Sequence, residues 1–412
     1  MTRSAHARTA ALWSAFLLAH LVTAWTGWVY PSQPMGDVVL VYEPWAASAL
    51  SGGGVVGVTE TWVYPQLALV PMLVAKVLAT PLVPLLGVSS AYLVAWATLI
   101  TVCDAIAFAV LAGRSPSRPR RAAACFWSAA LVLLGPIAIY RIDAITVPIA
   151  VVGGLWLISR PVIAAALLTV GAWIKIWPGV LVVAAVAAGR ARIRMLLSAA
   201  AVTAGVMASL VLLGADTELL GFLTEQAGRG LQIEAVAATP FLWLAAYGGA
   251  RVEYSLEILT FQIAAPGVDV VSAVLTPVML LAVAGVTAVG AVKGLRGASF
   301  SRLFPPLALA LVTVLIVTNK VGSPQFQTWL IVPVILWIVF DGTRARMPAL
   351  IVLILCALTC LVYPLGYDGL LRTELLPILV LTLRNLLLLV LLAVGIRALV
   401  RVPVPRRPKP QE

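Results

Sequence analysis

Asp37 is the carboxylate best placed to move a proton, because it opens the segment 31–63 directly after the first apolar run of the chain. Loops of that length are usually functional. A carboxylate near a membrane surface can take the proton from a hydroxyl during attack on a lipid-borne group, as a general base does. The alternative is structural: Asp is a common N-cap, so Asp37 would cap the helix that follows. The residues alone leave both interpretations open.

Isolated cations form a second candidate set, because Lys175, Lys320 and Arg384 stand outside the basic clusters of the chain. Ionisable residues at membrane depth are costly and by default mark a functional site. Lys and Arg bind phosphate well, so these three residues are predicted to hold a phosphate. Alternatively, each cation snorkels to the interface or pairs with a neighbouring acid, as Arg141 would with Asp143.

A third set could hydrogen-bond a sugar or another polyol. Arg229, Gln232 and Glu234 follow one another closely in a long polar segment, 214–268, and Gln325 lies in a polar break beyond Lys320. The predicted sugar or acceptor site is completed by the neighbours Arg141 and Asp143. A solvated loop face is the plainer explanation of the acids and amides.

Composition identifies the elements that must position these groups. The chain has 412 residues, of which 62% are hydrophobic, and its mean hydropathy is +1.05, which excludes a soluble protein. At about 20 residues per crossing, such a chain forms about 11–13 helices. We therefore expect an all-α, polytopic membrane protein with outer-face loops and short amphipathic helices: one domain over 1–401 and a disordered tail over 402–412.

Charge predicts the orientation of the chain. It carries 28 Lys and Arg against 16 Asp and Glu, a net charge of +12. The basic residues cluster in alternate links, whereas most acids fall in the others, so by the positive-inside rule both termini are cytoplasmic and the three candidate sets lie on the extracytoplasmic face. This charge reports orientation, and nucleic acid is not an expected partner. The N-terminal run is read as a retained helix rather than a signal peptide.

Two stretches depart from simple crossings. The segment 62–112 holds two apolar runs but must start outside and end inside, so one of them is predicted to be interfacial or re-entrant, unless the Arg114–Arg121 link breaks the charge rule. The runs 162–173 and 179–189 are too short to span about 30 Å, which favours partial helices that meet near Lys175.

No cofactor or metal is expected. No Asp-x-Asp motif or dense carboxylate cluster is visible, and two or three basic side chains can neutralise one phosphate. The four cysteines all fall inside apolar runs and are interpreted as small core residues.

Taken together, these features resemble the GT-C superfamily of integral-membrane glycosyltransferases, and within it glycosyltransferase family 87, which uses polyprenyl-phosphate-mannose. The resemblance covers nearly the whole chain and rests on these motifs in order: Gly36-Asp37, Trp62-Val-Tyr64-Pro65, Arg141-Ile-Asp143, Lys175-Ile-Trp177-Pro178, Arg229-Gly-Leu-Gln232-Ile-Glu234, Thr318-Asn319-Lys320 with Ser323-Pro324-Gln325, and Arg384-Asn385. It implies that Asp37 is the catalytic base. It also implies a multi-pass protein of the cell membrane whose partners are a polyprenyl-phosphate sugar, a lipid or glycan acceptor and membrane lipids.

The chain departs from the family pattern in two places. Tyr64-Pro65 is followed by Gln66 where many members have a second proline, and the only histidines are His6 and His20, so no outer-face histidine is present. We expect inverting transfer of a hexose, which the resemblance implies is mannose, with the acceptor left open. The rival functions are a transporter or flippase of a lipid-linked or polar solute, for which no two-fold internal repeat is visible, and a structural membrane protein.

Overall fold

The computed structural model describes residues 3–215, 221–222, 229–255 and 260–405. The chain is an all-α, polytopic membrane protein, as predicted, and ten helices in the described residues are long and apolar enough to cross a membrane. Nine of them contain the long helices α1 (Arg3–Val29), α5 (Val88–Ala112), α6 (Arg118–Leu134), α10 (Arg192–Leu212), α13 (Val268–Leu295), α14 (Phe300–Val317), α15 (Gln327–Asp341), α16 (Arg346–Cys360) and α18 (Leu375–Val400).

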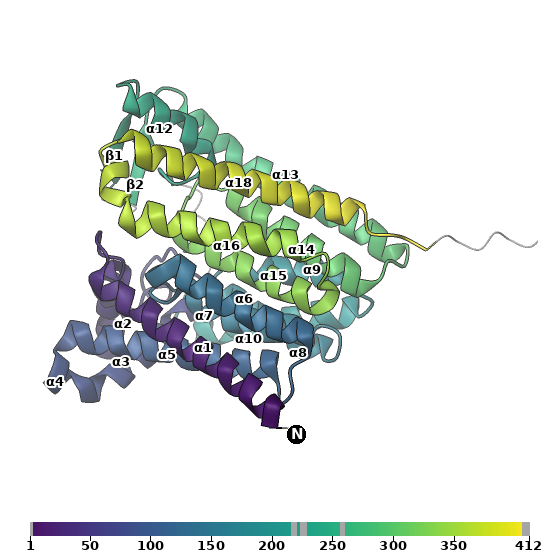
Figure 1. The fold of residues 1–412 in the computed structure, drawn as a ribbon. Helices are drawn as coiled ribbons and strands as arrows, with labels where there is room; N and C mark the ends of the chain where they lie inside the picture. Colours follow the sequence, from purple (N-terminus) through teal and green to yellow (C-terminus); the bar gives the residue numbers. More distant parts are fainter. Residues whose placement is uncertain (1–2, 216–220, 223–228, 256–259, 406–412) are drawn as a thin grey trace, which may run out of the picture.

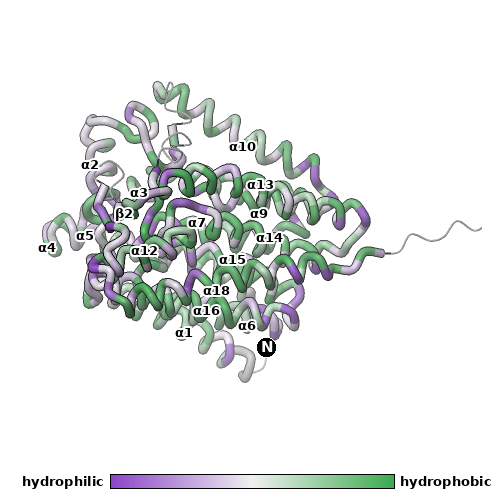
Figure 2. Tube along the Cα trace, turned by 90° about the horizontal axis from the view of Figure 1, so that it is seen from above, coloured by the Kyte–Doolittle hydropathy of each residue, from purple (hydrophilic) through white to green (hydrophobic). Residues whose placement is uncertain are grey.

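Both ends of the described chain lie at the same end of the helix bundle (Figure 1). We call it the terminal end, and the opposite end the loop end. Hydrophilic segments lie at both ends of the bundle in Figure 2. At the terminal end, the basic links 113–117, 189–191 and 296–299 join neighbouring helices. The alternation predicted from charge is therefore present in the fold. That the terminal end is cytoplasmic stays a prediction.

The centre of the bundle is α15, in which every residue from Gln327 to Ile338 is buried. Helix α14 packs beside it and is buried along most of its length. Helices α10 and α13 are the opposite case, with few buried residues. A helix that is apolar on all sides belongs either in a core or against lipid. The bundle therefore has a protein-packed centre and lipid-exposed outer helices.

The segment 66–86 is long and apolar enough to cross a membrane, but it is not one continuous helix. It consists of η2 (Gln66–Ala68), α3 (Leu69–Ala79), η3 (Thr80–Leu82) and α4 (Val83–Leu86). Figures 1 and 2 place α4 farthest out at the loop end. The Tyr92 hydroxyl donates to the Met72 carbonyl (3.1 Å), so α3 packs on the first half of α5. Only α5 continues to the terminal end, as expected if the first of the two runs is interfacial or re-entrant; the number of crossings stays a prediction.

Three short helices cross only part of the bundle: α7 (Asp143–Trp156), α8 (Pro161–Ile174) and α9 (Pro178–Ala188). At about 1.5 Å per residue, the 14 residues of α7 and of α8 rise about 21 Å. Their ends meet near Lys175, where Trp177 Nε1 donates to Thr146 Oγ1 over 2.9 Å. The prediction of partial helices meeting at this position is confirmed.

The loop end is built from short elements. The segment 31–63 contains η1 (Val38–Tyr42) and α2 (Glu43–Leu50), and later links contribute η4 (Gly135–Ala138), η6 (Val236–Ala238), α12 (Thr239–Ala246), η7 (Pro324–Phe326), η8 (Leu361–Leu365) and α17 (Tyr367–Leu371). The sequence did not predict the antiparallel pair β1 (Arg251–Ser255) and β2 (Thr260–Ala264), in which Glu253 faces Gln262. This pair lies beside α12 (Figure 1).

Two smaller predictions need correction. Cys356 and Cys360 are buried in the core, but Cys125 is exposed on α6 and Cys103 is half-buried, so the four cysteines do not share one environment. Val402 is ordered, contrary to a disordered tail that starts there, because Lys293 Nζ donates to its carbonyl over 2.8 Å and Val402 is buried. Residues 406–412 lie outside the described residues.

Candidate functional site

Asp37 lies at the loop end, immediately before η1, with a side chain that is 40% exposed. Its Oδ2 is 3.3 Å from Nε of Arg141, which is almost fully buried. Asp37 makes no side-chain hydrogen bond to the start of η1, so the helix-cap interpretation is wrong. Within the described residues, no hydrogen bond is formed by its other oxygen, Oδ1. The carboxylate is thus held on one side and open on the other.

Arg141 connects four segments that are distant in sequence. Its Nη1 donates to the carbonyls of Pro34 (2.7 Å) and Tyr140 (2.9 Å). Its Nε also donates to Gln325 Oε1, and its Nη2 donates to the Tyr363 hydroxyl, both over 3.2 Å. A planar guanidinium can make these contacts together because its five N–H groups point in fixed directions. Arg141 therefore pairs with Asp37, and the alternative of a pair with Asp143 is wrong.

Fully buried Asp143 and partly buried Lys175 form a separate pair where α7 begins and α8 ends. Lys175 Nζ is 3.7 Å from Oδ2 of the fully buried Asp143, and Trp329 Nε1 donates to Asp143 Oδ1 over 2.6 Å. Lys175 Nζ also lies 4.4 Å from the ring centroid of Tyr64, a cation–π contact. A buried charge needs such a partner to offset the cost of desolvation.

Lys175 is also coupled to the other charged groups of the site. The charges of Asp37 and Arg229 both act on it, in addition to that of Asp143. Arg229 is half-buried and its charge also reaches Tyr64. The carboxylate, the buried lysine and one residue of the predicted sugar site thus share one electrostatic environment.

Arg384 is engaged by the segment 229–240 rather than left open to a ligand. It is 2% exposed, and its Nη1 and Nη2 donate to the Oε2 (2.5 Å) and the carbonyl (2.7 Å) of Glu234. Its Nε and Nη2 also donate to Asn385 Oδ1, and Asn385 Nδ2 donates to Thr239 Oγ1 over 2.8 Å. These contacts use most of the donors that a phosphate would need. Arg384 and Glu234 attach this segment to α18.

Lys320 and Gln232 lie in two loops that touch. The Gln232 N–H donates to the Lys320 carbonyl over 3.0 Å, and a Cβ at Gly322 would overlap the backbone of Glu234 and Ala235. The Lys320 side chain is 8% exposed, and burial lowers its pKa. Gln232 also bridges to Gln262 of β2, which gives the strand pair a role in positioning this loop.

The structure brings all ten predicted residues to the loop end in three linked groups. Asp37, Arg141 and Gln325 form the first group, Asp143, Lys175 and Arg229 the second, and Gln232, Glu234, Lys320 and Arg384 the third. The charge of Arg141 acts on Glu234 and so links the first group to the third.

Sequence reasoning missed several supporting residues. Tyr363 touches Arg141 and also donates to the carbonyls of Ser32 (3.2 Å) and Gln33 (3.3 Å), and Trp329 fixes Asp143. A tyrosine or tryptophan near the end of an apolar run is usually read as an interface residue, so neither carried a distinct signal.

A buried pair within the bundle was also missed. His20 Nε2 of α1 lies 3.0 Å from Asp104 Oδ2 of α5, and both side chains are buried. Here a signal was available, because a lone histidine and a lone aspartate in two apolar runs are each costly unless they meet.

Among the described residues, no group of three or more His, Cys, Asp or Glu side chains gathers in a way that could hold a metal ion. Comparison with protein-family models, curated proteins and solved structures found no match to this chain.

Proposed function

We propose that this protein is an inverting glycosyltransferase that moves a hexose, mannose by the sequence resemblance, from a polyprenyl-phosphate carrier to a lipid or glycan acceptor. The observation that carries the proposal is the Asp37 carboxylate, 40% exposed and held by a buried arginine, with the partly buried cation Lys175 close enough for its charge to interact with Asp37. A base beside a phosphate-binding cation is what transfer from a sugar phosphate requires. The loop end would then face the extracytoplasmic side.

In the proposed reaction, Asp37 Oδ1 removes the proton from an acceptor hydroxyl. The oxygen attacks the anomeric carbon from the side opposite the phosphate, so the new C–O bond forms as the bond to phosphate breaks and the configuration inverts. The electron pair stays with the polyprenyl phosphate, which leaves as an anion. It needs cations rather than a general acid, because the leaving oxygen carries charge that positive groups stabilise.

Lys175 and Lys320 are the proposed phosphate ligands. Each ammonium has three donors, and the single Asp143 contact of Lys175 leaves others for a ligand. Arg384 is reassigned from ligand to positioning residue, since its donors bind Glu234 and Asn385. Gln232 and Gln325 present amides near the cations and remain the proposed contacts to sugar or acceptor, with Arg229 beside them.

The partial helices α7 to α9 and the buried charges also suit a transporter or flippase, since transport sites are often built at broken helices. The exposed, arginine-held carboxylate is the feature that favours transfer. A transporter needs a path for its solute and not a base. Loss of the Asp37 carboxylate should therefore stop formation of the glycosylated acceptor only if the protein is a transferase.

The test uses the full chain in proteoliposomes supplied with polyprenyl-phosphate-mannose and a glycolipid acceptor. We expect the Asp37→Asn variant to lose transfer by about 10²- to 10⁴-fold, the usual contribution of a general base. Asp269→Asn, which removes an exposed carboxylate at the start of α13, is the matched control and should transfer normally. Transfer by the wild type should persist with a chelator present. Transfer by Asp37→Asn at the wild-type rate would refute the role of Asp37 as general base. Solute flux without any transfer would favour the transporter.

A further inference from the structure

The terminal end contains a cavity of about 610 Å³ that the proposed reaction does not use. Four arginines from three parts of the chain line it: Arg302 of α14, Arg344 of the link after α15, and Arg397 and Arg401 at the end of α18. We call it the arginine cavity.

Most of the charge in the arginine cavity is uncompensated. Among the described residues, Asp341 is the only acid that lines it, and it is already paired with Arg344 over 2.8 Å. Arg302, Arg397 and Arg401 form no ion pair or side-chain hydrogen bond with any residue that the structure describes.

Other arginines at the same end behave differently. Arg120 donates to the carbonyls of Val110 and Leu111, and Arg192 donates to carbonyls at the end of α9. Those residues complete helix ends, as basic side chains often do. The positive-inside rule explains the number of basic residues at this end, but it does not require three unpaired guanidinium groups to converge on one cavity.

The remaining wall of the cavity is apolar. Trp337 lines it and is 2% exposed. Met347 also lines the cavity, and together with Leu350 and Ile354 it forms an exposed apolar strip on α16. An exposed apolar strip on a membrane protein contacts acyl chains, so lipid can reach the cavity from the side.

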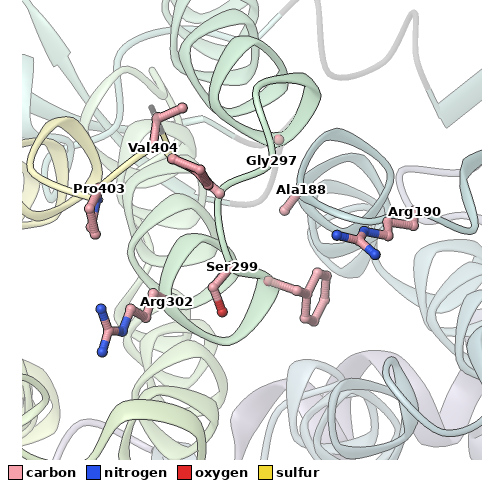
Figure 3. A pocket seen from close by; sticks show the side chains of 11 residues that line it. Ala188, Arg190, Gly297, Ser299, Arg302, Pro403 and Val404 are labelled. Carbon is pink, nitrogen blue, oxygen red and sulfur yellow. The ribbon is translucent and has the colours of Figure 1, made fainter. Parts of the chain in front are cut away.

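A second cavity, of about 620 Å³, lies next to the first and shares Arg302 and Pro403 with it. Figure 3 shows Arg190 and Arg302 on opposite sides of this second cavity, with Ser299 between them. Arg302 therefore stands at the boundary of two basic cavities, which gives a bulky polar headgroup room beyond its phosphate.

We infer that the arginine cavity binds an anionic phospholipid of the leaflet at the terminal end. Arg302, Arg397 and Arg401 contact the phosphodiester, and the acyl chains lie along α16. Basic pockets between transmembrane helices are suited to lipid phosphates, since guanidinium groups bind phosphate oxygens strongly.

The test measures lipids retained by the full chain, by native mass spectrometry, after extraction from phosphatidylcholine vesicles that contain a minority of phosphatidylglycerol. We expect wild type to retain phosphatidylglycerol. The triple variant Arg302→Gln/Arg397→Gln/Arg401→Gln should bind it on the order of a hundredfold more weakly, because each basic group near an anionic lipid contributes about a factor of five.

The control triple variant, Arg114→Gln/Arg118→Gln/Arg296→Gln, removes the same charge from arginines at the same end that are equally exposed but do not line the cavity, and it should retain the lipid. Equal loss in both triple variants would show diffuse attraction and overturn the proposal. Displacement of the lipid by millimolar inorganic phosphate would likewise overturn it, since the site would then bind the free ion. Size-exclusion profiles identify any variant that loses lipid through misfolding.

Discussion

Arg141 holds Asp37 across 3.3 Å although more than a hundred residues separate them in the chain. The same guanidinium contacts Pro34, Gln325 and Tyr363, so the position of the carboxylate depends on three loops at once. In the proposed reaction Arg141 acts through Asp37 and is a positioning residue.

Replacing Arg141 by lysine should therefore impair transfer while keeping the positive charge. An ammonium cannot reproduce the planar, five-donor contacts, so Asp37 would lose its fixed orientation. We expect kcat to fall by about 10- to 100-fold with a much smaller change in donor KM. Arg372→Lys, at an exposed pair with Glu374, is the control and should leave both constants unchanged. A change in KM alone would assign Arg141 to donor binding instead.

A double-mutant cycle on Asp143 and Lys175 should separate stability from function: the second substitution should restore stability but not transfer. Asp143→Asn leaves Lys175 buried without its counter-charge and should destabilise the protein by about 3–5 kcal/mol. Adding Lys175→Met should restore much of that stability, because no unpaired charge remains, but it should abolish transfer, because the proposed phosphate ligand is gone. Thermal unfolding and transfer assays on the four proteins of the cycle measure both effects. Restored transfer in the double variant would exclude Lys175 as a phosphate ligand.

Gly322→Ala should separate the two loops that carry Lys320 and Glu234. The alanine Cβ would overlap the backbone of Glu234 and Ala235, and backbone atoms cannot move aside as a flexible side chain can. We expect a raised donor KM and a folded bundle, since the long helices are untouched. Gly285→Ala, on α13 where a Cβ meets nothing within 4 Å, is the control and should be neutral or slightly stabilising. Normal kinetics for Gly322→Ala would show that loop contact is dispensable.

Donor binding should weaken as the pH rises, and it should do so at a lower pH than the pKa of an unperturbed lysine would predict. Burial lowers the pKa of Lys320, so its cation is present at low pH and is lost as pH rises through that lowered value, below about 10.4. The donor KM should then rise on the alkaline side in the wild type. In Lys320→Arg the rise should move to higher pH, because arginine stays charged. An identical pH profile in both proteins would contradict a role for the Lys320 charge.

The His20–Asp104 pair should matter for stability and not for transfer. His20 Nδ1 lies 2.9 Å from the Phe16 carbonyl, which only accepts, so Nδ1 carries a proton and Nε2 faces the aspartate. Asp104→Leu leaves that histidine buried without its partner and should lower stability by about 1–3 kcal/mol. Transfer per folded molecule should equal that of the wild type. A selective loss of transfer would instead connect the pair to the loop end.

Much of the architecture was predictable because hydropathy and charge are local properties of the chain. The apolar runs became the helices, the short runs around Lys175 became partial helices, and the basic links gathered at one end. The candidate site residues could be selected for the same reason, since a charge inside an apolar run is costly wherever the run folds.

Which charges pair was decided only by the tertiary structure. Sequence proximity favoured Arg141 with Asp143, yet the turn before α7 directs Arg141 to Asp37 and leaves Asp143 to Lys175. Arg384 is identifiable as a buried cation, but its partner Glu234 lies 150 residues earlier in the chain. The path of 66–86 depends likewise on its packing against α5. Composition determines what must be buried, whereas distances between remote segments determine which groups meet.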